Sequence, residues 1–345
     1  MAVVRPAVAR TVVLHAPGDL RLEDVPLPPP GPGEVLLRIT ACGLCPGEVM
    51  DWYMGRKAPV PLGHEAVGRV VEAGEGAEFQ PGERVFVHHH APCLACRACR
   101  RGHHVHCRTW RARRLLPGGL ATFAVAQAPA VAADTLRLPD GVSDEAATFI
   151  EPLACVVKSL RRARLRPGDR VLVVGAGVMG LLHLLALRRV ARPAVVIAAD
   201  RIPARLEVAA RHADLVVDTG RRPLADAVGE ATDGEGADVA IVGPGTLEAL
   251  DAAFGALAPG GTLVVFTPTP PERPWPVPVH DLFFREVSIV PSYSSGPPET
   301  REALGLLADG LPVEGLISHR LPLAETSVGY DLIRNGAALK VVVVP

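Results

Sequence analysis

The chain falls into two regions that differ in how hydrophobic and polar positions alternate. Before residue 153, short apolar runs such as Glu34–Thr40, Gly68–Ala73 and Arg84–His88 are separated by turns rich in Gly and Pro. Runs of this length that are bounded by turn residues are typical of β-strands. We therefore predict a β-rich first region.

From residue 153 onwards, strand-like runs alternate with amphipathic helical stretches. The predicted strands are Arg170–Val174, Ala194–Ala199, Leu215–Val217, Asp238–Val242 and Thr262–Phe266. Strands that alternate with helices predict a parallel sheet with helices on both faces. After residue 291 the pattern is mixed again, and the chain ends in the strand-like run Lys340–Val344.

Length and charge narrow the classes of protein to consider. A chain of 345 residues is long enough for two domains, and 36 basic residues nearly balance 37 acidic ones. A formal net charge of -1 gives no reason to expect nucleic acid or a membrane surface as partner. The apolar runs are too short to span a bilayer, and no secretory signal is visible, so we expect a cytoplasmic protein.

A glycine-rich turn follows the predicted strand Arg170–Val174. Its sequence is Gly175-Ala176-Gly177-Val178-Met179-Gly180, and an apolar helix comes next. In a dinucleotide-binding turn of this kind, the first glycine permits the tight turn, the second lets the backbone approach a pyrophosphate, and the third lets helix and strand pack closely. The N-terminus of the helix then offers free N–H groups to the phosphates. The alternative is a structural turn that holds no ligand.

The end of the next strand indicates which dinucleotide this turn would bind. Asp200 lies twenty residues after Gly180, where a carboxylate can accept hydrogen bonds from ribose hydroxyls and would repel a 2′-phosphate. Arg201 and Arg205 weaken that preference, because arginine can accommodate a 2′-phosphate. We predict NAD rather than NADP, with Val242, at the end of a later strand, also in the coenzyme site.

Four of the seven cysteines lie within fifteen residues. They are spaced as Cys93-x2-Cys96-x2-Cys99-x7-Cys107. Four thiolates in a short loop are typical of a tetrahedral structural zinc site with no open coordination position. We interpret the nearby His103, His104 and His106 as surface residues and His88-His89-His90 as the end of a strand and its loop.

A second metal site is suggested by residues far apart in the sequence. The candidates are Cys45 in Gly43-Leu44-Cys45, His64 and Glu65 in Gly63-His64-Glu65, and Glu151 in Glu151-Pro152-Leu153. Three protein ligands with one open position are the usual arrangement of a catalytic zinc ion. Spacing alone cannot bring these residues together.

The order of these motifs along the chain resembles that of the zinc-containing medium-chain dehydrogenases. The resemblance implies an α/β protein with a GroES-like β-rich catalytic domain at 1–152 and 291–345. A Rossmann coenzyme domain with a doubly wound parallel sheet would occupy 153–290. It also implies two zinc ions, NAD, and a homodimer or homotetramer.

The same resemblance assigns roles to the candidate ligands. Cys45 and His64 would bind the catalytic zinc, and Glu65 would be a direct or alternating ligand. Glu151 stands where the classical alcohol dehydrogenases have Cys, which is similar to the sorbitol and threonine dehydrogenase branch. It would bind zinc directly or through water. We therefore predict hydride transfer between NAD and a polyol, sugar alcohol, cyclitol or secondary alcohol.

The sequence departs from the family where the substrate proton usually leaves. Gly47 replaces the usual Ser or Thr, Met50 replaces a His, and Glu48 stands where the family often has Asp. The proton would then leave through water, Glu48 or another group. This departure leaves two alternatives open: a lyase- or epimerase-type enzyme that retains NAD through an internal redox cycle, and a non-catalytic dinucleotide-binding protein.

Overall fold

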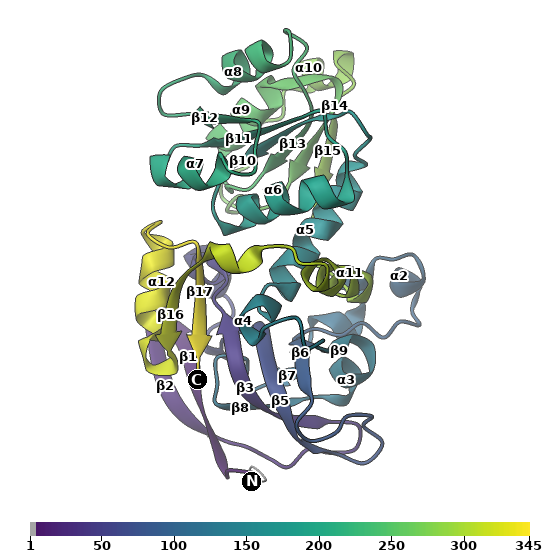
Figure 1. Ribbon diagram of the computed structural model, residues 1–345, viewed down its shortest axis with the longest axis vertical. Coiled ribbons are helices and arrows are strands. Elements are labelled where there is room, and N and C mark those ends of the chain that lie inside the picture. Colours follow the sequence, from purple (N-terminus) through teal and green to yellow (C-terminus); the bar gives the residue numbers. More distant parts are fainter. Residues whose placement is uncertain (1–4) are drawn as a thin grey trace. The chain divides into compact units, whose positions relative to one another are not determined.

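The computed structural model describes residues 5–345, whose contacts divide into two compact units (Figure 1). One unit contains the chain up to Ala154 together with Ser295–Pro345, and the other contains Cys155–Ser294. The boundaries expected from the sequence were 152/153 and 290/291. Helix α5 (Ile150–Ala163) begins in the first unit and continues into the second.

The first unit is built mainly of antiparallel strands. Its strands are β1 Val8–Ala16, β2 Asp19–Pro26, β3 Val35–Gly43, β4 Val60–Pro61, β5 Glu65–Ala73, β6 Arg84–His88, β7 Leu115–Leu116, β8 Phe123–Ala126, β9 Thr135–Arg137, β16 Ile317–Pro322 and β17 Lys340–Val344. One sheet has the order β2-β1-β4, and a larger one has the order β16-β17-β3-β5-β6-β9 with β7 and β8 beside β3. Buried residues of β3, β5 and β6 pack into a shared core that includes Leu37, Val70 and Val85.

The register of the larger sheet joins segments from both ends of the chain. Gly43 in β3 pairs with Glu65 in β5, and Glu65 in turn pairs with His88 in β6. On the other side of β3, Val342 of the C-terminal strand β17 pairs with Gly43. Residues from four distant stretches of sequence therefore meet at one end of this sheet.

Short helices connect the strands of the first unit. They are η1 Pro46–Val49, α1 Asp51–Met54, α2 Arg97–Arg100, η2 His104–His106, η3 Arg108–Arg111, α3 Ala128–Asp134, α4 Asp144–Ala147, α11 Pro297–Ala308, η4 Val313–Leu316, η5 Leu323–Glu325 and α12 Thr326–Arg334. Cys45 is the N-cap of η1, and its Sγ accepts a hydrogen bond from the Gly47 N–H at 3.3 Å. Cys42, three residues before Cys45, is buried in the core and packs as a small apolar side chain.

The second unit is a six-stranded parallel sheet with helices between its strands. In chain order the elements are β10 Arg170–Val174, α6 Val178–Val190, β11 Val195–Asp200, α7 Pro203–Ala209, β12 Leu215–Asp218, α8 Leu224–Ala231, β13 Ala237–Val242, α9 Leu247–Gly255, β14 Leu257–Val265, α10 Val279–Phe284 and β15 Ser288–Pro291. The strand order is β12-β11-β10-β13-β14-β15, so the sheet changes winding direction at β10. This is the doubly wound order of a Rossmann fold.

These observations confirm the predicted α/β class, with an antiparallel unit and a parallel unit. In an open parallel sheet, ligands bind beyond the carboxyl ends of the strands where the winding changes direction. The glycine-rich turn directly follows β10 and so lies at that point. Over residues 5–345, no helix combines the length and the apolar character that crossing a membrane requires.

Candidate metal and coenzyme sites

Cys45, His64 and Glu65 come together at one end of the larger sheet. One ligand atom from each of the three lies within 4.8 Å of the other two. Cys45 is held by the start of η1, whereas Glu65 begins β5 and His64 directly precedes it. Among the described residues, only this group and the four-cysteine group have such a metal-binding arrangement.

Glu48 fixes the orientation of the His64 ring. His64 Nδ1 lies 3.0 Å from Glu48 Oε1. Because an ionised carboxylate only accepts hydrogen bonds, Nδ1 is the donor and Nε2 is left available to a metal. Burial opposes the ionisation of Glu48, but the His64 ring and hydrogen bonds from His64, Tyr330 and Gly63 lower its pKa to about 2.

The surroundings of His64 favour positive charge. Burial alone would lower the pKa of His64, but Glu48 and Cys45 outweigh it and raise the pKa well above its ordinary value. A neighbourhood that stabilises an imidazolium also stabilises a bound cation, since both depend on nearby negative charge.

Glu65 and Lys340 form an ion pair that is sealed from solvent. Lys340 Nζ donates to Glu65 Oε2, and both side chains are 1% exposed. The pair occupies the space beside Gly43, because a Cβ there would overlap both charged groups. Glu65 Oε1 is buried and has no hydrogen-bond partner among the described residues.

The donor set and the orphaned Glu65 oxygen fit zinc. A thiolate, an imidazole and a carboxylate are all zinc ligands, and three of them leave a fourth position open. Glu151, at the start of α5, is buried and raises the pKa of Glu65 through its charge, after the larger effect of burial. It lies outside the group of ligand atoms within 4.8 Å of one another.

Three residues at this site were not assigned to it from the sequence, and one of them, His89, was interpreted as part of a strand end and its loop. Lys340 and Tyr330 come from the C-terminal segment, and His89 follows β6. The His89 ring lies 4.9 Å from the His64 ring, centroid to centroid, and its Nδ1 is buried without a partner in the described structure. Burial and the neighbouring histidines hold the pKa of His89 well below its ordinary value, so its ring is neutral.

The sequence did contain a signal for the role of Lys340: it is a single lysine in a strand that is otherwise apolar. The run Lys340–Val344 is otherwise all valine, and the chain contains only three lysines. A buried lysine requires a partner of opposite charge. For His89 the signal was the run His88-His89-His90, which the sequence analysis interpreted as a loop, and no comparable signal pointed to Tyr330.

The four cysteines of the lobe also converge. Cys93, Cys96, Cys99 and Cys107 each place a sulfur within 4.8 Å of the others. The Cys93 N–H donates to Cys107 Sγ at 3.3 Å, and the Cys96 N–H donates to Cys93 Sγ at 3.3 Å. Backbone N–H groups that point at sulfur stabilise thiolates, which are the form that binds zinc.

The lobe has little else to hold it together. Its apolar cluster consists of Cys99, Val105, Cys107 and Trp110, with Cys96 packed against it. Burial raises the pKa of Cys107, but hydrogen bonds from Cys93 and Thr109 outweigh it and lower the pKa to about 5. A small cluster that contains three of the ligands fits a structural metal site.

The three glycines of the turn after β10 face different constraints. Gly175 has φ +91°, and a Cβ there would lie 2.8 Å from Pro244 Cδ. A Cβ at Gly180 would overlap the Gly175 carbonyl, so this glycine is needed for packing. Gly177 has ordinary φ, and its Cβ would meet only Arg205, at 3.6 Å. Its glycine is explained by the close approach of a ligand rather than by the protein's own packing.

Asp200 supports the turn from the end of β11. Its carboxylate accepts from the N–H groups of Ala176 at 2.7 Å, Arg201 at 2.7 Å and Ile202 at 2.9 Å. A carboxylate has about four lone-pair positions, so one remains for a ribose hydroxyl. Arg205 Nη1 lies 4.0 Å from Asp200 Oδ2, within the same site. Val178 and Met179 begin α6 directly after Gly177, and Val242 ends β13 beside β10.

Comparison with known proteins places both units in one family. The model of the alcohol dehydrogenase GroES-like domain matches residues 31–140, and that of the zinc-binding dehydrogenase matches residues 178–309. The chain is 34% identical to the sorbitol dehydrogenase of Bos taurus over 96% of its length and 95% of that protein's. It is 30% identical to the erythritol/L-threitol dehydrogenase of Mycolicibacterium smegmatis, over 99% of this chain and 98% of that one.

A solved structure from Sinorhizobium meliloti 1021, bound to NADP, is similar over the whole chain. It shares 27% identity with a TM-score of 0.86, over 99% of this chain and 100% of that chain. The full-length relatives, the two family models and the strand order of the second unit agree with one another. The chain belongs to the zinc-dependent medium-chain dehydrogenases of the alcohol dehydrogenase superfamily, and it is an enzyme.

Proposed function

We propose that this protein oxidises a polyol or a related secondary alcohol and transfers the hydride to NAD. The observation that carries this proposal is the convergence of Cys45, His64 and Glu65, with an orphaned carboxylate oxygen, in a chain that has polyol dehydrogenases as full-length relatives. Sugar alcohols and cyclitols belong to the same substrate class. A simple secondary alcohol is the main alternative substrate.

In this proposal each residue of the site has a definite task. Cys45, His64 and Glu65 would hold the zinc ion, and Glu151 would act on it directly or through water. Glu48 holds His64 in the tautomer that presents Nε2. When bound, the zinc ion supplies a Lewis acid that makes an alcohol easier to deprotonate, and the nicotinamide accepts the hydride.

The proton route differs from that of most of the family. Gly47 offers no hydroxyl, and both oxygens of Glu48 already accept hydrogen bonds, one from His64 and one from Tyr330. Glu48 therefore acts through His64, and the substrate proton leaves by water or by another group. The partly exposed His89 ring lies beside the His64 ring and is, in this proposal, a further group that could accept a hydrogen bond from a substrate hydroxyl.

The two rival functions have less support. The relatives named above are dehydrogenases, which release reduced coenzyme, so an internal redox cycle is not favoured. A non-catalytic binding protein would have no use for an open metal site. We therefore retain net alcohol oxidation as the function.

We propose NAD rather than NADP as the coenzyme, and one zinc in each of the two sites. Asp200 places a negative charge at the end of β11, where it disfavours a 2′-phosphate. Arg201 and Arg205 act in the opposite direction. The ratio of kcat/KM with NAD and NADP tests this preference, and a higher value with NADP would reverse it.

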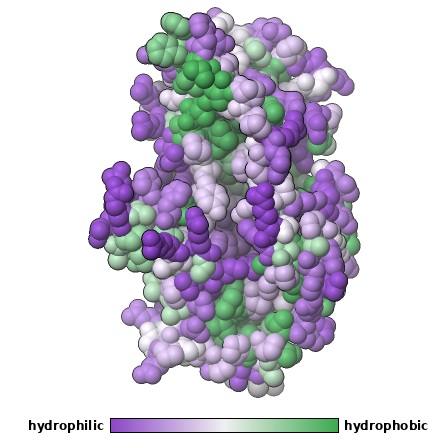
Figure 2. Space-filling model, turned by 180° about the vertical axis from the view of Figure 1, so that it is seen from behind, coloured by the Kyte–Doolittle hydropathy of each residue, from purple (hydrophilic) through white to green (hydrophobic). Residues whose placement is uncertain are grey.

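We also propose that the chain forms a homodimer or homotetramer in the cytoplasm. Helix α10 exposes Val279 by 68%, Phe283 by 70% and Phe284 by 70%. Figure 2 shows hydrophobic surface gathered toward the upper end of its view, the end at which Figure 1 shows α10. Exposed apolar patches of this kind mark association surfaces, and the neighbouring β15 is an open sheet edge. None of the seven cysteines, all of which lie in the described residues, forms a disulfide, which fits a reducing compartment.

The decisive experiment follows NADH formation by absorbance with a panel of polyols and secondary alcohols. It compares wild type with Cys45→Ser, which leaves the four-cysteine lobe intact. We expect turnover with at least one polyol in wild type and its loss in Cys45→Ser, with NAD binding retained. Zinc-loaded wild type that binds NAD but forms no NADH with any panel member would refute the proposal.

A further inference from the structure

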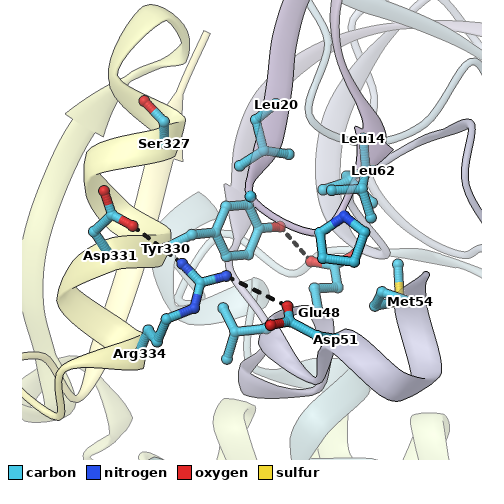
Figure 3. A pocket seen from close by; sticks show the side chains of 13 residues that line it. Leu14, Leu20, Glu48, Asp51, Met54, Leu62, Ser327, Tyr330, Asp331 and Arg334 are labelled. Atoms are coloured by element: carbon cyan, nitrogen blue, oxygen red, sulfur yellow. Dashed lines mark hydrogen bonds and ion pairs between the residues drawn. The ribbon is translucent and has the colours of Figure 1, made fainter.

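The hydroxyl of Tyr330 is the one polar group of the C-terminal helix α12 that reaches the candidate zinc site through Glu48. Figure 3 shows Tyr330 pointing from α12 toward Glu48 on η1. We propose that Tyr330 is a positioning residue for the catalytic metal: it holds Glu48, which holds His64. This inference rests on the proposed function, and it assigns a role to a residue 282 positions away from Glu48.

The three residues form a continuous chain of hydrogen bonds. The Tyr330 hydroxyl donates to Glu48 Oε2, while Glu48 Oε1 accepts from His64 Nδ1 at 3.0 Å. The Gly63 N–H adds a longer contact to Oε1, at 3.4 Å. Both carboxylate oxygens are therefore fixed, so the plane of the carboxylate, and with it the His64 ring, has one orientation.

Burial makes the hydroxyl important. Tyr330 is 2% exposed, and the Glu48 side chain is 5% exposed. If the hydroxyl were removed, Glu48 Oε2 would lose its protein donor, and only water in the neighbouring cavity could take its place. The carboxylate could then rotate about the Cγ–Cδ bond of Glu48, and the His64 ring would lose its fixed orientation.

The neighbouring cavity sets the size of the effect. A cavity of about 50 Å³ is lined by Glu48, Tyr330 and Met54, among others (Figure 3). It has room for a water molecule, which would partly replace the lost hydroxyl. We therefore expect an effect at the lower end of those seen when groups behind a metal ligand are changed, which is about 10-fold in metal retention.

The role of Tyr330 is separate from that of the other buried partner of the site. Lys340 acts on Glu65, and it reaches the site from strand β17 rather than from α12. Arg334, one turn after Tyr330, pairs instead with Asp51 and Asp331 at the surface. Tyr330→Phe therefore changes the support of His64 alone and keeps the ring that packs in the core.

The test measures zinc transfer to an excess of a chromogenic chelator in the full-length, zinc-loaded protein. The release phase that Cys45→Ser abolishes belongs to the candidate catalytic site, and the remaining phase belongs to the four-cysteine lobe. We expect Tyr330→Phe to speed the first phase by about 10-fold and to leave the second unchanged. Tyr293→Phe, at an exposed tyrosine of the other unit, is the matched control and should change neither phase.

A second pair of variants shows whether Tyr330 acts through Glu48. In a Glu48→Ala background the hydroxyl has no carboxylate to hold, so adding Tyr330→Phe should have no further effect. The inference would be overturned if Tyr330→Phe released zinc in the first phase at the wild-type rate. It would also be overturned if Tyr330→Phe sped that phase as much in the Glu48→Ala background as in wild type. A wild-type protein with no phase that depends on Cys45 would refute the proposed metal site itself, and this inference with it.

Discussion

Replacing Lys340 by Met tests how the buried ion pair with Glu65 contributes to stability. The change keeps the length of the side chain but leaves Glu65 as a buried carboxylate without a counter-charge. Breaking a buried pair by removing one partner typically costs about 3–5 kcal/mol. Both side chains are 1% exposed, so water cannot replace the lost partner and the full range applies.

The expected change in melting temperature follows from the size of the unit that carries the pair. For a domain of about 200 residues, each kcal/mol shifts Tm by about 2–4 °C. Lys340→Met should therefore lower the Tm of the metal-free protein by about 6–20 °C, measured by calorimetry at neutral pH. In the zinc-loaded protein the loss should be smaller, because a bound cation compensates for part of the charge of Glu65.

Two further variants isolate the pair from other effects. Lys158→Met removes a lysine whose Nζ makes an exposed hydrogen bond to the Tyr293 carbonyl at 2.7 Å, and it should cost less than about 1 kcal/mol. The double variant Lys340→Met with Glu65→Gln should recover more than half of the lost stability, since no unpaired charge remains. A Tm for Lys340→Met equal to that of Lys158→Met would show that the reasoning is wrong.

Four other expectations follow from the structure. Cys107→Ser should leave one zinc per chain, measured by elemental analysis, and make the lobe protease-sensitive; retention of two zincs would contradict the four-thiolate site. Gly177→Ala should raise the Kd for NAD at least about 10-fold in fluorescence titrations without lowering Tm, because its Cβ meets only Arg205 at 3.6 Å. Burial lowers the pKa of His183 from 6.5 to about 4, so its unfolded form takes up a proton first as the pH falls. Between pH 6.5 and 4, the free energy of unfolding should therefore fall by about 3 kcal/mol more in wild type than in His183→Gln. Above pH 6.5 the two proteins should show the same pH dependence, and curves that stay parallel down to pH 4 would contradict the prediction. Phe283→Ser should lower the mass measured by light scattering to that of a smaller assembly, whereas an unchanged mass would place the interface elsewhere.

The strands were predicted where apolar runs were continuous. Arg84–His88, Arg170–Val174 and Lys340–Val344 have the same bounds in the structure as in the sequence analysis. The prediction for β5 began at Gly68, whereas the strand begins at Glu65, because a buried glutamate interrupts the apolar pattern. The hairpin of β1 and β2 was not identified, since its exposed residues are too irregular to show alternation.

The metal-binding candidates could be named from motifs, but their supports could not. Cys45, His64 and Glu65 stand in recognisable local sequences. Lys340 lies 275 residues from its partner Glu65, and it reaches it only through the pairing of β17 with β3. Such a contact depends on sheet register across the whole unit, which single-sequence patterns do not specify.

The place of Lys340 near the end of the chain has a consequence for the order of assembly during synthesis. Residues 155–294 are continuous and can fold as soon as they leave the ribosome, as domains generally do. The first unit, by contrast, cannot be completed before strand β17 is synthesised. Until then Glu65 lacks its partner Lys340, and Glu48 lacks Tyr330 until α12, shortly before β17, has been made. The candidate catalytic site is therefore completed only after the whole coenzyme unit has been synthesised, and a nascent chain that has not yet reached β17 has a finished coenzyme domain and an unfinished metal site.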